Sequence, residues 1–326
     1  MKRRRLIEFM AAAVTAPCST FAQSSRRSYR IAILDDADES ARKADWLAFR
    51  NRLGELGISQ GKNAAFDARF AGGEHERLLG LARELVAAKP DIVVTTGTPA
   101  ARAAIKASAE IPVVFIGAAD PIGSGLVASL SRPGGNATGL SVLSNETTQK
   151  SLELLHELAP GVQRVAFITD PANEIVASIF SRLTDSAQRL NVTVQMMDGV
   201  GQAALARTFE GIRREHLQAL LIGTTGTLLD HRDEIVRFAA REKLPAVYGR
   251  VEFVRAGGLL SYGVDRINGA RRAAEYVQRI LLGESPATIP VEQTSTVHMA
   301  VNLKSARAAG IKIPDSIRVR ADEVIQ

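Results

Sequence analysis

One local pattern occurs twice in this chain and constrains its fold more than any other feature. An apolar strand pattern leads into the tetrapeptide Thr-Thr-Gly-Thr, and a helical pattern follows. The first copy is Thr95–Thr98 and the second is Thr224–Thr227. A strand that ends in threonine and glycine at the start of a helix exposes hydroxyl and N–H groups, which bind polar or anionic ligand groups. Two such strand ends predict two similar α/β lobes that face one ligand.

The same alternation of strand and helix patterns runs through most of the chain and restarts after residue 141. Strands that alternate with helices of this length imply parallel sheets with right-handed crossovers. We therefore predict an α/β fold of two Rossmann-like lobes with parallel sheets, joined by a multi-strand hinge. The N-terminal lobe is expected to comprise residues 29–141 plus about 264–290, and the C-terminal lobe residues 142–263 plus about 291–326. A chain of 326 residues is long enough for two cores.

The N-terminus has the features of an export signal. The basic segment Lys2–Arg5 precedes an interrupted apolar run, and the small-residue site Thr20-Phe21-Ala22 follows. This order predicts a signal peptide over residues 1–22, cleaved after about Ala22, and a periplasmic protein. Arg3–Ile7 also fits the core of a twin-arginine signal, so both export routes stay open. The apolar run is shorter than the roughly 20 residues of a membrane span, so no stable membrane insertion is expected.

Charge and cysteine content exclude further classes of function. The net charge is +6, and residues 1–22 contribute four basic residues and one acidic residue, so the remainder carries +6 − 3 = +3. Nucleic-acid binding needs a stronger, clustered positive charge, so no nucleic-acid partner is predicted. The sole cysteine, Cys18, lies in the presequence, where it is a weak candidate for lipidation. Removal of that segment leaves no thiol for disulfides, catalysis or metal binding.

The sequence lacks complete catalytic and cofactor-binding motifs. Gly57–Gly61 matches G-x-S-x-G by its letters, but it leaves a helix and approaches a strand, which is the reverse of a nucleophile elbow. No dinucleotide fingerprint follows a strand, no P-loop sequence occurs, and the five histidines lack the spacing of a metal pair. We therefore predict a binding protein and no enzyme, with neither a cofactor nor a metal.

The candidate ligand-binding residues lie where predicted strands end, because the crevice of an open parallel sheet lies beyond these ends. The alternative for each is that it only caps the next helix. The candidates are Asp35, Asp36, Thr96, Gly97, Thr98, Asp120, Thr169, Asn173, Thr224, Thr225, Tyr248, Arg250 and Tyr262.

Roles follow from the side-chain chemistry of these candidates. Thr98 and Thr225, with neighbouring N–H groups, are expected to hold a ligand carboxylate, and Asp120 or Asp36 to face an ammonium group. Tyr248 or Tyr262 is expected to stack on an apolar or aromatic moiety. Arg250 offers instead a bidentate contact to an anion. These groups can bind a ligand. They do not include a nucleophile, a base and an orienting residue at a spacing that indicates a catalytic site.

An ordered series of motifs adds a family resemblance. Ile111–Phe115, Asp120-Pro121-Ile122, Gly125–Leu130, Arg132–Gly139 and Ala256–Gly263 occur in succession. Together they resemble the substrate-binding proteins of ABC transporters, in the branch that includes tryptophan- and tyrosine-associated receptors. The resemblance covers almost all of residues 29–326.

The resemblance implies a type I periplasmic binding fold and an exported receptor, expected to be a monomer, whose partners are a small-molecule solute, a membrane permease and its ATPase. It also implies that Thr96–Thr98, Asp120 and the second-lobe loops line the cleft. The chain departs from the family pattern at Asp35-Asp36, Thr224-Thr225 and Val264-Asp265. These departures fall at the expected cleft, so they argue against an aromatic amino acid as the ligand. An exported sensor for a membrane signalling partner and a secreted α/β enzyme are the alternatives.

Overall fold

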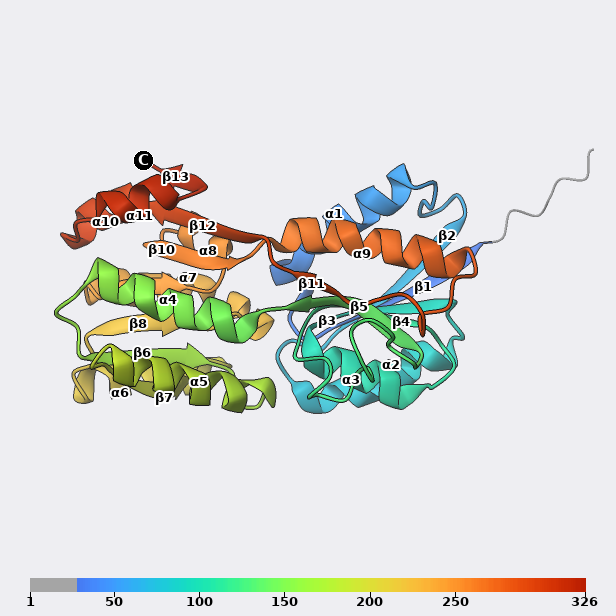
Figure 1. The fold of residues 1–326 in the computed structure, drawn as a ribbon, viewed down its shortest axis with the longest axis horizontal. Coiled ribbons are helices and arrows are strands. Elements are labelled where there is room, and N and C mark those ends of the chain that lie inside the picture. The colour runs from blue at the N-terminus through green and yellow to red at the C-terminus, as the bar shows by residue number, and fades with distance from the viewer. Residues whose placement is uncertain (1–27) are drawn as a thin grey trace, which may run out of the picture.

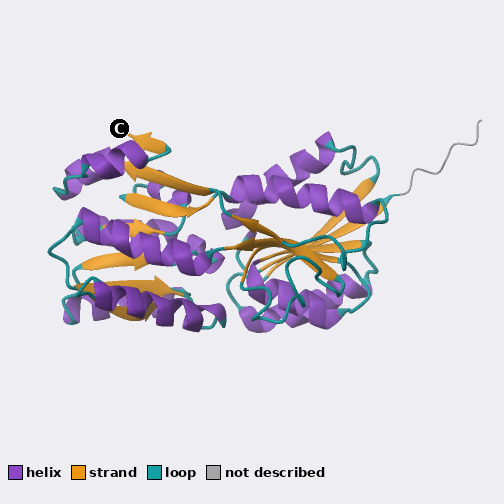
Figure 2. Ribbon diagram, viewed as in Figure 1, coloured by secondary structure: helices purple, strands orange, loops and turns teal. Residues whose placement is uncertain are grey.

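The computed structural model describes residues 28–326 as two α/β lobes that lie end to end (Figure 1). The predicted signal peptide and Cys18 lie outside the described residues. Each lobe has a central sheet with helices on both faces (Figure 2), so the predicted α/β fold with two mostly parallel sheets is confirmed. Within residues 28–326, no helix is long and apolar enough to cross a membrane.

The first lobe is built on a parallel sheet with the strand order β11-β5-β4-β3-β1-β2. Its elements are β1 (Tyr29–Asp35), α1 (Glu39–Glu55), β2 (Ala64–Phe70), η1 (His75–Arg77), α2 (Leu78–Ala87), β3 (Ile92–Thr96), α3 (Gly97–Ala107), β4 (Val113–Ala119), β5 (Ala137–Val142), α9 (Arg266–Leu281) and β11 (Glu292–Thr294).

Both faces of this sheet are buried, which explains the near-continuous apolar runs of its inner strands. On one face, Phe49 and Leu53 of α1 pack with Val277 of α9 against the sheet. On the other face, α2 and α3 cover the sheet, and Ala100 and Ala104 of α3 contribute to that core. Figure 1 shows α1 and α9 side by side on their face of the lobe.

The second lobe has the strand order β13-β12-β10-β9-β8-β6-β7, and only the β10–β12 pair is antiparallel within the described chain. Its elements are α4 (Ser144–Leu158), β6 (Arg164–Thr169), α5 (Ile175–Arg189), β7 (Thr193–Asp198), α6 (Gln202–Arg214), β8 (Ala219–Ile222), η2 (Gly226–His231), α7 (Arg232–Arg241), β9 (Ala246–Tyr248), α8 (Val251–Arg255), β10 (Leu260–Val264), β12 (Val297–Asn302), α10 (Leu303–Ala309), α11 (Asp315–Arg320) and β13 (Glu323–Ile325).

The described chain passes between the lobes at three places: from β5 to α4, from β10 to α9, and from β11 to β12. The last crossing lies later than the boundary near residue 291 that we predicted, because β11 still pairs with β5 in the first sheet. β11 is the polar stretch Glu292-Gln293-Thr294 at a sheet edge. Such a strand lacks the apolar alternation by which strands are recognised in a sequence.

Candidate functional site

A cavity of about 370 Å³ lies between the two lobes at the carboxyl ends of several strands. Gly97 and Thr98 line it from the start of α3, and Thr224 and Thr225 line it from the loop after β8. Arg250, just before α8, belongs to the same wall. The two Thr-Thr-Gly-Thr segments thus contribute to one space, from opposite lobes.

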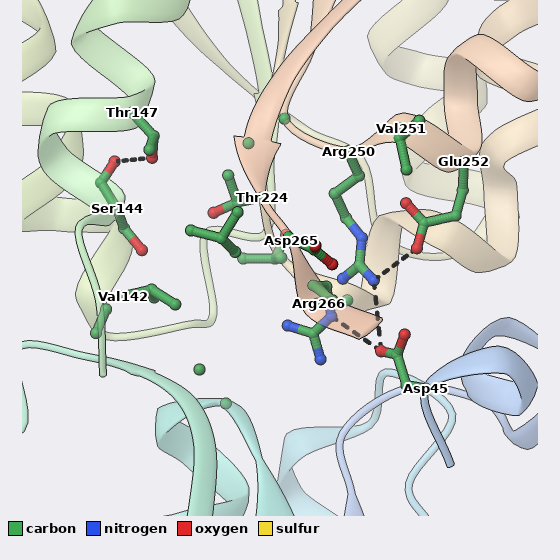
Figure 3. A pocket seen from close by; sticks show the side chains of 18 of the residues that line it. Asp45, Val142, Ser144, Thr147, Thr224, Arg250, Val251, Glu252, Asp265 and Arg266 are labelled. Atoms are coloured by element: carbon green, nitrogen blue, oxygen red, sulfur yellow. Dashed lines mark hydrogen bonds and ion pairs between the residues drawn. The ribbon is translucent and has the colours of Figure 1, made fainter. Parts of the chain in front are cut away.

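A charged cluster centred on Asp45 forms one side of this cavity (Figure 3). Asp45 Oδ2 accepts a hydrogen bond from Arg266 Nε at 2.9 Å, and it lies 3.5 Å from Arg42 Nη1 and 3.8 Å from Arg250 Nη2. Burial alone would raise the pKa of Asp45, but Arg266, Arg250 and Arg42 together lower it to about 2. The carboxylate of Asp45 therefore stays ionised. It contacts Arg42 of its own lobe, Arg250 of the second lobe, and Arg266 at the crossing from β10 to α9.

Arg42 lies behind this cluster and is almost completely buried. Its Nε is 3.2 Å from Asp35 Oδ1, and its Nη2 is 3.1 Å from Asp36 Oδ1. Asp35 also accepts a hydrogen bond from Trp46 Nε1 at 2.8 Å. Burial raises the pKa of Asp35, whereas for Asp36 the Arg42 guanidinium outweighs burial and lowers the pKa. Buried charges require such pairing, so Arg42 and Asp35 act as structural support for the cavity wall.

Arg250 and Arg266 present the positive charge of the cluster towards the cavity. Arg250 Nη2 donates to Glu252 Oε1 at 3.1 Å, whereas its buried Nε and Nη1 have no partner among the described residues. Burial and the neighbouring Arg42 and Arg250 lower the pKa of Arg266 to about 10. In Figure 3, the terminal nitrogens of Arg266 point away from Asp45 and into the cavity.

The opposite wall is mainly apolar, with hydroxyl groups beside it. Ile175, Val176 and Ile179 come from the first turns of α5, and Val142 comes from the end of β5. Ser144 and Thr147 of α4, together with Val264 and Ile267, lie along the same cavity. A ligand here meets an arginine-rich side and an aliphatic side at once.

The lobes also touch each other beside the cavity. His75 Nε2 in η1 lies 2.7 Å from Asp170 Oδ2 in the second lobe, and Thr227 Oγ1 donates to the same oxygen at 2.9 Å. The pKa of His75 is raised, chiefly by its hydrogen bond to Asp170. Arg102 Nη2 lies 2.6 Å from Glu174 Oε1 across the lobes. These contacts hold the lobes together around the cavity.

The structure divides the predicted site residues into two groups. Those that line the cavity are Asp36, Gly97, Thr98, Asn173, Thr224, Thr225 and Arg250. Those that do not line it are Asp35, Thr96, Asp120, Thr169, Tyr248 and Tyr262.

The second group has other structural roles. Asp120 is exposed, adopts a positive φ of 41°, and accepts a hydrogen bond from the N–H of Gly123 at 2.9 Å, so it lies outside the cavity lining, away from the expected ammonium group. Tyr248 is buried and stacks on Phe253 at 5.1 Å between ring centroids. Tyr262 packs against the core beside α4 and α5. The expected stacking of either tyrosine on a ligand is therefore not supported.

The remaining members of this group lie at strand ends, behind the cavity wall. Thr96 and Thr169 are buried at the ends of β3 and β6. Asp35 is engaged with Arg42 and Trp46, as described above. Even Thr98, which lines the cavity, uses its hydroxyl to donate to the carbonyl of Ala119 at 3.2 Å.

Sequence reasoning missed Arg42, Asp45, Arg266 and the apolar residues of α5. A signal for two of them existed, because Arg42 and Asp45 have helical spacing with Trp46, Phe49 and Leu53 on the buried face of α1. Charged residues on an otherwise apolar helix face indicate a buried polar cluster. Nothing comparable marked Arg266, which begins a helix among other arginines.

Comparison with known proteins agrees with this architecture. Residues 30–325 match the family model described as "ABC transporter substrate binding protein". A curated relative, a tyrosine-binding protein of Clostridioides difficile, is 25% identical over 279 residues, which are 84% of this chain and 80% of that protein.

Solved structures are also similar. A conserved domain protein from Vibrio cholerae has a TM-score of 0.85 and 27% identity, and covers 91% of this chain and 100% of its own. The ABC domain from Streptococcus pneumonia in complex with L-Trp has a TM-score of 0.83 and 25% identity, with the same coverage. Two of these relatives are described as a tyrosine-binding protein and as a domain in complex with L-Trp. The fold is that of type I periplasmic binding proteins. This chain belongs to the family of ABC transporter substrate-binding proteins.

Proposed function

We propose that the chain is the periplasmic solute-binding component of an ABC importer. In this proposal, the signal peptide is cleaved after about Ala22, and the mature protein binds a small organic solute, an amino acid or related carboxylate, between its lobes. It then delivers the solute to a membrane permease and its ATPase. The observation that carries the proposal is a cavity lined by both lobes and by two of the crossing segments.

Closure around a ligand is the physical basis of this function. The crossings at residues 142–144 and 264–266 lie at the cavity, so rotation about them changes its width. A solute that contacts both lobes interacts with the closed state more than with the open state, and only such a difference shifts the equilibrium. Asp36, Gly97 and Thr98 from the first lobe, with Asn173, Thr224, Thr225 and Arg250 from the second, are the proposed contacts.

The chemistry of the cavity supports binding without turnover. Its arginines are paired with carboxylates, Asp265 caps α9, and the hydroxyls of Thr98 and Thr147 donate to backbone carbonyls. Among the described residues that line the cavity, no hydroxyl group is hydrogen-bonded to a histidine. The commonest serine and threonine nucleophiles are activated by such a histidine, and we propose that the solute leaves unchanged.

Mass spectrometry of the solute that co-purifies with the exported protein tests the proposal. The expected result is one small molecule per chain that is released on denaturation and rebinds unchanged, and addition of that molecule to the emptied protein makes it more compact in small-angle scattering. Chemical alteration of the molecule, or binding with no change in shape, contradicts the proposal.

A further inference from the structure

Arg266 has hydrogen-bonding capacity that the protein itself does not use. It is the first residue of α9, directly after the crossing from the second lobe. Its Nε donates to Asp45 at 2.9 Å, and its two terminal nitrogens make no hydrogen bond among the described residues. An ideal Cβ on Gly117 would lie only 3.2 Å from Arg266 Nη1, so the glycine leaves room for this guanidinium. The terminal nitrogens are thus held in place and directed at the ligand space (Figure 3).

Positive charge is crowded at this point of the cavity. Arg250 and Arg266 both contact the carboxylate of Asp45. Arg250 also has two buried nitrogens, Nε and Nη1, without a hydrogen-bond partner in the described chain. An unpaired buried donor is unfavourable, and a nearby anion compensates it through hydrogen bonds and charge. The lowered pKa of Arg266 reflects the same crowding. Both observations indicate an anionic ligand group next to Arg266.

The carboxylates of the cavity are already engaged. Asp36 pairs with Arg42, Asp45 with three arginines, and Glu252 with Arg250. Asp265 caps α9 by accepting the N–H of Asn268 at 3.0 Å. A ligand ammonium group is bound most favourably by a carboxylate whose charge is not already balanced by an arginine. Three of the four acidic side chains that line the cavity are paired with arginines, and the fourth, Asp265, caps a helix.

The rest of the ligand space favours an aliphatic body. Ile175, Val176, Ile179 and Val142 form its apolar wall, and the described lining contains no Phe, Tyr or Trp. Aromatic ligands are commonly held by stacking on such rings. The volume of about 370 Å³ lies at the lower end of the range of roughly 300–1,000 Å³ for small-molecule sites, which accommodates a compact molecule.

We infer that the ligand is a compact aliphatic organic acid without an α-ammonium group. Its carboxylate binds the terminal nitrogens of Arg266, and its hydrocarbon body packs on Ile175, Val176 and Ile179. This inference rests on the proposed function and narrows it, because it excludes zwitterionic and aromatic amino acids as the preferred ligands.

Four matched probes test the inference by calorimetry on the mature protein after removal of co-purified solute. They are 4-methylpentanoate, leucine, 4-methylpentanamide and 3-phenylpropanoate, which differ in the ammonium group, the carboxylate and the ring. We expect 4-methylpentanoate to bind at least about tenfold more tightly than each of the others, because only it satisfies the arginine without an unpaired ammonium.

Variants of α9 locate the contact. Arg266→Gln is expected to weaken 4-methylpentanoate binding by at least about tenfold, and Arg266→Lys by less, because lysine keeps the charge without the planar donor pair. The control is Arg271→Gln on the same helix, where Arg271 pairs with Glu55 at 3.0 Å on the outer surface, and unchanged affinity is expected. Circular dichroism of each variant separates loss of binding from loss of folding, and Arg266→Lys carries the test if Arg266→Gln does not fold.

The inference and the proposed function fail in different ways. If leucine or 3-phenylpropanoate binds as tightly as 4-methylpentanoate, or if both Arg266 variants bind normally, the inference is wrong and the solute-binding function stands. If none of the probes binds at millimolar concentration while another solute co-purifies, the inference is also wrong. If no small molecule co-purifies or binds at all, both fail.

Discussion

The hydrogen bond between His75 and Asp170 makes lobe closure depend on pH. The two groups lie in different lobes, 2.7 Å apart, and Asp170 is 1% exposed whereas the His75 side chain is 14% exposed. Hydrogen bonding to Asp170 raises the pKa of His75 in this structure, where the lobes touch, and Asp36 and Glu174 act in the same direction. We expect an opened form, in which His75 faces water, to restore the ordinary pKa of about 6.5.

The sign and size of the effect follow from this difference. Because the closed-state pKa of His75 is the higher one, the stabilisation is complete below about pH 6.5 and is lost as the pH rises through the raised value. A hydrogen bond between charged groups contributes about 1.5–3 kcal/mol, which is about ten- to hundredfold in the open–closed equilibrium. Ligand affinity scales with the closed population, so it falls by up to this factor as the pH rises above about 6.5 and through the raised pKa of His75.

Calorimetry of the co-purified solute at several pH values measures this effect in the native protein and in His75→Ala. We expect the variant to bind weakly and with little pH dependence, because Asp170 keeps only its contacts within the second lobe. Arg77→Ala is the control, since Arg77 is exposed in the same short helix and lies 3.5 Å from Glu74 of its own lobe. An equal pH dependence in the native protein and in His75→Ala would refute the reasoning.

Three further predictions use other parts of the site. Gly226→Ala should weaken ligand binding, because its Cβ would lie 1.9 Å from Arg42 Nη2 of the other lobe. Gly269→Ala, which lies within α9 with open space around it, should leave binding unchanged and raise the melting temperature slightly. Asp45→Asn should lower the free energy of unfolding near pH 7 by about 3–5 kcal/mol in chemical denaturation. Its difference from the native protein should shrink as the pH falls towards about 2, where Asp45 becomes protonated; a constant difference contradicts this. Asp120→Ala should leave the ligand affinity measured by calorimetry unchanged, because Asp120 is exposed and outside the cavity lining. Weaker binding by this variant would show that Asp120 belongs to the ligand site.

The local pattern of residues was sufficient to predict most of the fold. Apolar runs such as Ile92–Val94, followed by glycine and threonine, specify a buried strand and the start of a helix through interactions between near neighbours. β11 was not recognised, since its pairing with β5 depends on a neighbouring strand and its own residues are polar. The residues of a buried strand indicate its burial by themselves. The pairing of a polar edge strand depends on a strand that lies elsewhere in the chain.

Strand ends also predicted part of the cavity lining. Gly97, Thr98, Thr224, Thr225 and Arg250 line it because the carboxyl ends of parallel strands meet at one edge of a sheet. The direction of a single side chain at such an edge was not predictable. Asp120 turns outwards at a positive φ, and Tyr248 turns into the core, where it stacks on Phe253.

The sequence by itself determined the strands, the helices and the sheet edges at which a ligand space lies, since hydrophobic period and turn chemistry act over a few residues. Only the tertiary structure decided that Asp45 meets Arg250 and Arg266. Asp45 and Arg266 are 221 positions apart, and Arg250 belongs to the other lobe. Their proximity follows from how the lobes pack around the crossings, which is a property of the whole chain and of no single segment.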